Sequence, residues 1–232
     1  MHSRIQVVIL AGGRGERLRP LTDRRPKPLL HVCGMPILEW TLQAVSDFAH
    51  EVLIVVGYKG EKIWKHLGDE YKGIPLRYIE QKELGGTAHA LSQAQHALDN
   101  RFMVLMGDDL YAAQDLKKLL EHPWAVLVKE VKRPKNFGIV RRDRRGYLKD
   151  IIEKPKHPPS RLANCAVYVM GREYFAYEPV RISSGETGLP QTLVKVAQSG
   201  ISIKVVRATF WHPIGYPADL QSAQKLLKVS KK

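Results

Sequence analysis

The 232-residue sequence is poor in cysteine and has no long apolar run, and both absences narrow what the chain can be. Its two cysteines, Cys33 and Cys165, lie far apart without a CxxC pair, so we expect two reduced thiols rather than a disulfide. A stretch of about 18 consecutive apolar residues is also missing, so no membrane span is expected. The apolar run at residues 5–10 is too short for a signal peptide and leads into a glycine-rich turn. We therefore expect a cytoplasmic protein.

Two common phosphate-binding patterns are absent as well. The sequence has no GxxxxGK[ST] loop, and the glycines of its N-terminal turn do not fit the dinucleotide pattern GxGxxG. Tandem hexapeptide repeats are missing, so no β-helix acyltransferase domain is expected. Since no linker or low-complexity segment interrupts the chain, residues 1–232 are predicted to form one domain.

The sequence does contain an excess of positive charge, with 37 Lys and Arg against 23 Asp and Glu and a formal net charge of +14. Such an excess of positive charge can bind nucleic acids or small anionic substrates, or it can form a basic surface without a specific partner. Residues 129–161 hold twelve Lys and Arg against four Asp and Glu, but no aromatic-rich platform for RNA accompanies them. Nucleic-acid binding is therefore the less favoured interpretation.

Hydrophobic patterning predicts an α/β fold. The β-branched-rich run at residues 5–10 is typical of a buried parallel strand. Strand-like and helix-like segments then alternate, which predicts a Rossmann-like, open, mostly parallel twisted sheet with helices on both faces. The expected strands of this first half are residues 52–56, 76–81 and 102–106, and the expected helices are 36–48, 61–67 and 87–98. Beyond residue 124 we expect strands at 125–131, 166–170 and 201–207, a hairpin of 137–140 and 147–152, and helices at 189–198 and 217–229.

The most distinctive feature is the glycine-rich turn after the first predicted strand, followed by a Pro-Lys-Pro sequence. Glycines let backbone N–H groups approach phosphate oxygens without interference from a Cβ atom. The guanidinium of Arg17 can bind two phosphate oxygens, and Lys27 has a backbone stiffened by the flanking prolines. The predicted nucleotide-binding residues of this segment are Leu10, Ala11, Gly12, Gly13, Arg14, Gly15, Arg17 and Lys27.

Residues 13–28 resemble the signature GxGxRxxPxTxxxPKP of the sugar-1-phosphate nucleotidylyltransferases. The matching residues are Gly13, Gly15, Arg17, Pro20, Thr22, Pro26, Lys27 and Pro28. The resemblance extends over nearly the whole chain and implies a nucleotide-diphospho-sugar transferase fold, with a nucleotide-binding half at 1–124 and a sugar-binding half at 125–232. It also implies that Arg17 and Lys27 bind the triphosphate and promote loss of pyrophosphate. Family members often associate, so homo-oligomerisation stays open.

Gln81 and the segment 84–91 predict the nucleobase site. A glutamine amide can donate and accept together, which matches the imide edge of uracil or thymine. The segment is similar to the Q…GTxHA segment of N-acetylglucosamine-1-phosphate uridylyltransferases and to glucose-1-phosphate thymidylyl- and uridylyltransferases. That resemblance assigns Gln81, Gly86 and Thr87 to the base of UTP or dTTP. Thr87 can also be an early residue of a capped helix, and His89 inside that helix is interpreted as structural.

Asp108 and Asp109 follow the strand predicted at residues 102–106. Acids at the carboxyl end of a parallel strand lie over the ligand crevice of such folds. One carboxylate, together with nucleotide phosphates and water, suits Mg²⁺. The resemblance places the metal-binding aspartate of the family at Asp108, so Mg²⁺ is the predicted cofactor. Asp109 is then expected to cap a helix or to face the sugar.

Two segments of the predicted hairpin look like the FG and EKP segments of the family, at Phe137-Gly138 and at Glu153-Lys154-Pro155. The resemblance implies a sugar-phosphate site in which Gly138 and Glu153 meet sugar hydroxyls and Lys154 holds the phosphate. It also assigns a sugar contact to Asn164. Without the resemblance, Glu153 and Lys154 would be interpreted as an ordinary surface ion pair.

One position departs from the family pattern. The family often has W-x-D-x-G-x-P near its end, with the aspartate as a second metal ligand, whereas this chain has Pro213 at that place. Proline has no side-chain ligand atom, and the neighbouring His212 is expected to point elsewhere on a strand.

The predicted function is transfer of a nucleotidyl group from UTP or dTTP to a sugar 1-phosphate, with release of pyrophosphate and formation of a nucleotide-sugar. The predicted catalytic residues are Arg17, Lys27 and Asp108. Because of Pro213, the alternative is a catalytically weak binding or regulatory protein of the same fold. The identity of the sugar stays open.

Overall fold

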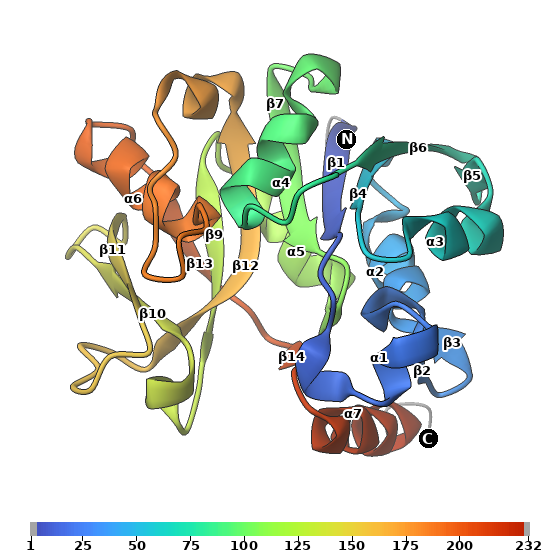
Figure 1. The fold of residues 1–232 in the computed structure, drawn as a ribbon. Helices are drawn as coiled ribbons and strands as arrows, with labels where there is room; N and C mark the ends of the chain where they lie inside the picture. Colours follow the sequence, from blue (N-terminus) through green and yellow to red (C-terminus); the bar gives the residue numbers. More distant parts are fainter. Residues whose placement is uncertain (1–3, 230–232) are drawn as a thin grey trace.

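The computed structural model describes residues 4–229 and is organised around one large mixed sheet (Figure 1). The strand order is β11-β10-β12-β7-β1-β4-β6-β5, and β9 pairs with β12 and with β13. The strands are β1 (Ile5–Ala11), β4 (Ala49–Val56), β5 (Glu70–Tyr71), β6 (Ile74–Glu80), β7 (Arg101–Met106), β9 (Ala125–Glu130), β10 (Gly138–Arg142), β11 (Leu148–Glu153), β12 (Leu162–Gly171) and β13 (Lys204–Arg207). The predicted segments therefore form strands, with small shifts at their ends.

The direction of pairing changes along the sheet. Strands β7, β1, β4 and β6 pair in parallel, as the alternation of strands and helices predicted. Strand β12 pairs antiparallel with β7, β9 and β10, and β10 pairs antiparallel with β11 in the predicted hairpin. Most antiparallel pairing in this sheet involves strands after residue 124, where the helix-strand alternation of the sequence ends. The exceptions are the short strand β5, which pairs antiparallel with β6, and β13, which pairs in parallel with β9. The sheet is continuous across both halves of the chain.

Helices cover both faces of the sheet, as predicted. Helices α2 (Ile37–Val45), α3 (Gly60–Leu67) and α5 (Ala113–Leu119) pack into one hydrophobic core, and α4 (Thr87–Gln93) and α6 (Leu189–Gln198) pack into the other. Strand β1 contributes to both, because Val7 and Ile9 face the first core and Val8 and Leu10 face the second. A strand covered on both faces must be apolar along its whole length, which explains its continuous hydrophobic run.

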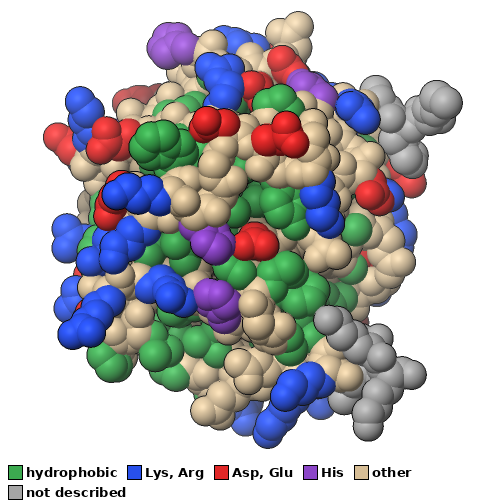
Figure 2. Space-filling model, turned by 90° about the vertical axis from the view of Figure 1, so that its right-hand side faces the viewer, with side chains coloured by type: hydrophobic (Ala, Val, Ile, Leu, Met, Phe, Trp, Pro, Cys, Tyr) green, Lys and Arg blue, Asp and Glu red, His purple; other side chains and the backbone are tan. Residues whose placement is uncertain are grey.

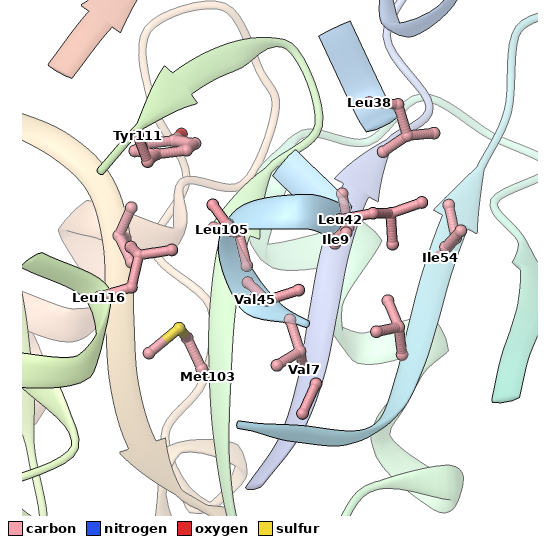
Figure 3. Packing of buried hydrophobic residues seen from close by; sticks show 14 of the residues in the cluster. Val7, Ile9, Leu38, Leu42, Val45, Ile54, Met103, Leu105, Tyr111 and Leu116 are labelled. Carbon is pink, nitrogen blue, oxygen red and sulfur yellow. The ribbon is translucent and has the colours of Figure 1, made fainter. Parts of the chain in front are cut away.

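Figure 3 shows the first core at close range. Val7 and Ile9 of β1, Ile54 of β4, and Met103 and Leu105 of β7 line this side of the sheet. Facing them are α2 and α5, through the side chains of Leu38, Leu42, Val45 and Leu116. This packing holds the carboxyl ends of β1 and β7 side by side, in register from Gln6↔Phe102 to Leu10↔Met106. The glycine turn and Asp108 follow these two strand ends.

A third, smaller core lies between the segment that follows β1 and the C-terminal helix α7 (Pro217–Val229). Leu18 is buried there with Ile214, Leu220 and Ala223. Two short strands, β8 (Asp109–Tyr111) and β14 (Trp211–Pro213), pair antiparallel and connect α7 to the end of β7. A second short pair, β2 (His31–Val32) and β3 (Met35–Pro36), precedes α2. The sequence did not predict these four strands. Pro36 ends β3 and is also the N-cap of α2, so the helix begins one residue later than predicted.

Charged side chains of both signs are spread over the face that carries α3 and the β5–β6 edge of the sheet (Figure 2). Lys and Arg are denser on one side of this face, with acidic, histidine and apolar side chains among them. No helix in residues 4–229 is long and apolar enough to cross a membrane.

Candidate active site

The glycine turn begins where β1 ends, and close packing explains its first glycine. A Cβ atom on Gly12 would lie 3.0 Å from Oε1 of Gln81 and 3.3 Å from the backbone nitrogen of Gly57. Gly13 faces open space, and Gly15 has a φ of 65°, in the left-handed region that favours glycine. The carboxyl ends of β1, β4 and β6 therefore meet at Gly12, through Gly57 and Gln81. The turn leaves the backbone at Gly13 accessible to a ligand.

Arg17 and its neighbour Leu18 lie in a short 3₁₀ turn at Glu16–Leu18. Leu18 is buried in the third core, which anchors the turn against α7. The guanidinium of Arg17 stacks on the ring of Tyr216, 5.2 Å from the ring centroid. Burial of Leu18 and the contact with Tyr216 therefore hold Arg17 beside the residues that precede α7.

Lys27 and Asp108 form an ion pair at the centre of the site. The distance between Lys27 Nζ and Asp108 Oδ2 is 2.6 Å, although the two residues are 81 positions apart in the sequence. Lys27 is only 8% exposed, whereas the side chain of Asp108 is 32% exposed. Asp108 follows Gly107, where a Cβ atom would lie 2.9 Å from Cγ2 of Ile9. Both strand packing and the Pro-Lys-Pro turn bring the two charges together.

A cavity of about 690 Å³ opens beside this ion pair. Six of the predicted site residues line it, three from the predicted catalytic group and three from the sugar-phosphate group: Arg17, Lys27, Asp108, Gly138, Glu153 and Lys154. A second hollow of about 500 Å³ shares Arg17, Lys27 and Asp108 with it. This second hollow is also lined by Arg14, Gly15 and Glu186. The site thus has two compartments with the same three charged residues between them.

The sugar-side residues come from the β10–β11 hairpin. Gly138 and Glu153 are direct partners in the ladder, and a Cβ atom on Gly138 would lie 2.9 Å from Oε2 of Glu153. The Glu153 carboxylate therefore extends over the glycine. Lys154 has a φ of 42° and donates its backbone N–H to the Phe137 carbonyl, which turns the chain at the cavity wall.

Asn164 does not line this cavity, although its Cβ lies beside Gly138, 3.9 Å from where a Cβ atom of that glycine would be. Its Nδ2 donates to the Tyr168 hydroxyl at 2.7 Å, and its Oδ1 accepts from the Ala166 backbone N–H at 3.0 Å. Both polar groups of the amide are thus used inside the irregular part of β12, where the register against β9 shifts.

The predicted base-side residues lie together beside the Gly12 turn. Gln81 is 5% exposed and follows β6, and its backbone N–H donates to the Val56 carbonyl. Gly86 has a φ of 95°, and a Cβ atom there would overlap the Thr187 carbonyl oxygen. Thr87 opens α4, and its hydroxyl oxygen accepts the backbone N–H of Leu189 at 3.0 Å. The segment before α6 therefore braces the loop that carries the predicted base contacts.

Asp109 lies in the short strand β8 and does not cap a helix. It is buried, and it lines the large cavity together with the sugar-side residues Gly138 and Glu153. Its Oδ2 accepts from Trp211 Nε1 at 3.0 Å and its Oδ1 from the Ile214 backbone N–H at 3.1 Å. Burial, and then the charge of Asp108, raise the pKa of Asp109 to about 7. Asp109 therefore anchors β14 to β8, which follows the end of β7.

The β14–α7 junction contributes residues that sequence reasoning missed. Asp219 lines the large cavity, and its Oδ2 accepts from the backbone N–H groups of Gly215 and Tyr216 at 2.9 and 2.8 Å. An acid in the first turn of a helix opened by proline is a recognisable capping signal. Pro213 also lines the cavity, opposite Asp109 in the ladder. As expected, His212 points elsewhere, with Nε2 3.0 Å from the Asp219 carbonyl oxygen.

The residues present fit a divalent cation that is held mainly by its substrate. Among residues 4–229, no group of three or more His, Cys, Asp or Glu side chains gathers in a way that could hold a metal ion. Asp108 is a partly exposed carboxylate on the cavity wall, and it already forms an ion pair with the ammonium of Lys27. The carboxylate of Asp109 is occupied by Trp211 and Ile214, and Pro213 offers no ligand. One carboxylate with substrate phosphates and water is a donor set suited to Mg²⁺.

Comparisons with known proteins agree with this geometry. The family model described as nucleotidyl transferase matches residues 6–229. The chain is 36% identical over 227 residues to the bifunctional protein GlmU of Methanocaldococcus jannaschii, covering 96% of this chain and 54% of that protein. It is also 36% identical over 235 residues to the UTP–glucose-1-phosphate uridylyltransferase AglF of Haloferax volcanii, covering 97% of both chains. The chain thus spans about half the length of the first of these relatives.

Two solved structures share the fold. A Bacillus anthracis protein described as a glucose-1-phosphate thymidylyltransferase, in complex with a sucrose, superposes with a TM-score of 0.83 at 26% identity, over 95% of this chain and 94% of that one. A UDP-glucose pyrophosphorylase complexed with UDP-glucose superposes with a TM-score of 0.88 at 20% identity, over 98% and 99% of the chains. The predicted nucleotide-diphospho-sugar transferase fold is confirmed. Since the family model covers nearly the whole chain, the protein belongs to the nucleotidyl transferase family.

Proposed function

We propose that this protein transfers a nucleotidyl group from UTP or dTTP to a sugar 1-phosphate, releasing pyrophosphate and forming a nucleotide-sugar. The observation that carries the proposal is the shared cavity. Arg17, Lys27 and Asp108 line the same cavity of about 690 Å³ as Gly138, Glu153 and Lys154, and they also line the second hollow of about 500 Å³. Membership of the nucleotidyl transferase family supports the same reaction class.

The reaction proposed here needs no strong base in the protein. A phosphate monoester has a second pKa of about 6, so the attacking oxygen of the sugar 1-phosphate is already anionic near neutral pH. The work of the site is to align this oxygen with the α-phosphorus and to neutralise charge. Lys154 would reduce the repulsion between the two anionic substrates. Arg17 and Lys27 would bind the pyrophosphate as it leaves.

The Lys27–Asp108 ion pair gives Lys27 a defined place before the nucleotide binds. In the substrate-free protein each charge neutralises the other at 2.6 Å. A bound triphosphate offers Lys27 a more highly charged partner, and Mg²⁺ offers the same to Asp108, so we propose that the pair separates on binding. The cation would supply charge neutralisation at the α-phosphoryl group. Asp108 would hold it from the protein side.

The pyrimidine base is proposed to bind beside Gly12, between Gln81 and the Gly86 loop. Gln81 Oε1 packs against the Gly12 turn, and we propose that the base binds beside this acceptor. An imide N–H of uracil or thymine can donate to this oxygen. The names of the relatives, which include a UTP-dependent enzyme, are in agreement with this assignment.

The test is a pyrophosphate-release assay on the purified chain. UTP, dTTP, CTP, ATP and GTP are each combined with Mg²⁺ and a panel of hexose and hexosamine 1-phosphates. We expect turnover with UTP or dTTP and at least one sugar 1-phosphate, and none when Mg²⁺ is removed with a chelator. Absence of pyrophosphate release with every pair would contradict the proposal.

One observation favours a second candidate, a nucleotide-sugar binding protein without turnover. Pro213 lines the cavity where the family pattern has an acid, so the protein offers one free carboxylate fewer to a cation. Tight binding of a UDP- or dTDP-sugar in calorimetry, together with no pyrophosphate release in the panel, would favour this candidate.

A further inference from the structure

His89 contacts the side chain that is proposed to read the base. Gln81 Nε2 lies 3.1 Å from Nδ1 of His89 and also donates to the Gly86 carbonyl oxygen at 3.4 Å. The other end of the same amide, Oε1, approaches the Gly12 turn. The two ends of the Gln81 amide therefore face different surroundings, with acceptors on one side and the proposed base site on the other.

The Gly86 carbonyl determines which way the amide points. A carbonyl oxygen can only accept, so the amide end beside Gly86 must be the NH₂ group. The same NH₂ group then donates its second proton to Nδ1 of His89, which requires the neutral ring to carry its proton on Nε2. Reversing the amide would place Oε1 against the Gly86 carbonyl oxygen, which cannot donate, and would require the ring to move its proton to Nδ1. His89 and Gly86 together therefore hold the carbonyl oxygen of Gln81 toward the base site.

The ring of His89 is itself held in place. A Cβ atom on Gly85 would lie 2.8 Å from Cγ of His89, so the ring packs directly against that glycine. The backbone N–H of His89 donates to the Thr187 hydroxyl at 3.1 Å, which ties the start of α4 to the segment before α6. His89 Nε2 lies 3.3 Å from Nε2 of Gln93, which is also 3.3 Å from the His89 carbonyl oxygen. Gln93 is exposed, so its amide can turn to accept from Nε2–H while water solvates that carbonyl.

We propose that His89 is a positioning residue that determines base specificity by fixing the orientation of the Gln81 amide. The proposal rests on the proposed function, because it concerns the same base site. With Oε1 held toward the ligand, the site accepts a hydrogen bond from N3–H of uracil or thymine. Cytosine presents an unprotonated N3 at the same place, and two acceptors then face each other. A Gln81 amide free to turn would offer its NH₂ group to cytosine and lose this discrimination.

Two substitutions separate positioning from packing. His89→Leu keeps an apolar side chain of moderate size and removes the acceptor at Nδ1. His89→Asn places its amide oxygen near the position of Nδ1, so it can still accept from Gln81. We expect the ratio of kcat/KM for UTP to that for CTP to fall about tenfold in His89→Leu, the usual effect of one lost hydrogen bond. In His89→Asn the ratio should stay within about threefold of the wild type.

A double variant tests whether His89 acts through Gln81. Gln81→Leu alone should abolish most of the discrimination between UTP and CTP. If His89 works only by orienting Gln81, adding His89→Leu to Gln81→Leu should not change the ratio further. A further tenfold fall in the double variant would show that His89 acts on the base by another route and would overturn the proposal.

The same variants are measured by binding, which needs no turnover. Calorimetric titration with Mg²⁺ and either UTP or CTP gives the two dissociation constants for each protein. A changed UTP/CTP ratio in His89→Leu, rescued in His89→Asn, supports the proposal even if no sugar 1-phosphate is turned over and the proposed reaction fails. A merely structural His89 would lower affinity for both nucleotides equally in both variants. That result, with normal turnover in the wild type, would overturn the positioning role and leave the proposed function intact.

Discussion

Replacement of Lys27 by methionine separates what its charge does for folding from what it does for the reaction. The side chain is almost fully buried, and its ammonium lies 2.6 Å from Asp108. Methionine keeps the length and apolar volume of the lysine stem and removes the charge. The change therefore deletes the ion pair and the proposed phosphate contact while the surrounding packing is preserved.

The expected effect on stability is modest. Breaking a fully buried ion pair costs about 3–5 kcal/mol, whereas an exposed pair contributes about 0–1 kcal/mol. Asp108 keeps 32% of its side chain exposed, so water can solvate the carboxylate after the ammonium is gone. We therefore expect the free energy of unfolding to fall by about 1–2 kcal/mol. The expected loss of transition-state stabilisation is on the order of 3 kcal/mol, more than a hundredfold in kcat/KM.

Urea denaturation and pyrophosphate release from UTP measure the two effects. Lys117→Met is the matched control, since Lys117 forms an ion pair of 2.7 Å with Asp47 on the surface, outside the cavity. Both partners are well exposed, so this variant should lose less than about 0.5 kcal/mol and turn over normally. If Lys27→Met retains turnover within threefold of the control, Lys27 does not act on the departing pyrophosphate.

Three further predictions concern glycines and the buried acid. In Gly86→Ala the free energy of unfolding, measured by urea denaturation, should fall by about 2 kcal/mol or more, because φ is 95° and the methyl group would overlap the Thr187 carbonyl. A loss below about 0.5 kcal/mol would contradict the proposed contact between the two loops. A Cβ atom on Gly13 would face open space, so in Gly13→Ala the free energy of unfolding should change by less than about 0.5 kcal/mol. The KM for UTP should rise severalfold, and an unchanged KM would show that Gly13 does not contact the phosphates. For Asp109, the raised pKa of about 7 means that the folded protein retains a proton that the unfolded chain releases near pH 4. The stability from neutral Asp109 is thus complete below pH 4 and is lost as pH rises toward and through 7. From pH 5 to pH 8 the free energy of unfolding of the wild type, relative to Asp109→Asn, should fall on the order of 2 kcal/mol; a difference independent of pH would refute the shift.

Features set by local patterns could be predicted from the sequence. The continuous apolar run of β1, the glycines after it and the acid after β7 occupy the predicted places, because each depends on neighbours in the chain. The parallel pairing of β1 with β7 then brings the two strand ends together. The meeting of Lys27 with Asp108 follows from these elements, although the 2.6 Å ion pair itself could not be foreseen.

Features set by distant contacts could not be predicted. Strands β8 and β14 have three residues each, too few to show a periodicity, and they pair because buried Asp109 accepts hydrogen bonds from Trp211 and Ile214. The stacking of Arg17 on Tyr216 joins the first and last segments of the chain. His89 looked structural in the sequence, since only the folded chain places its ring beside Gln81. No local pattern encodes contacts across such separations.

The measurement that tests the central claim most directly is a crystal structure of the protein with Mg²⁺ and UTP. The account predicts that the triphosphate lies along the turn at Gly13 and Arg17, that Lys27 Nζ has left Asp108 for a phosphate oxygen, and that Asp108 binds the cation. A nucleotide bound elsewhere, with Lys27 still 2.6 Å from Asp108, would contradict it.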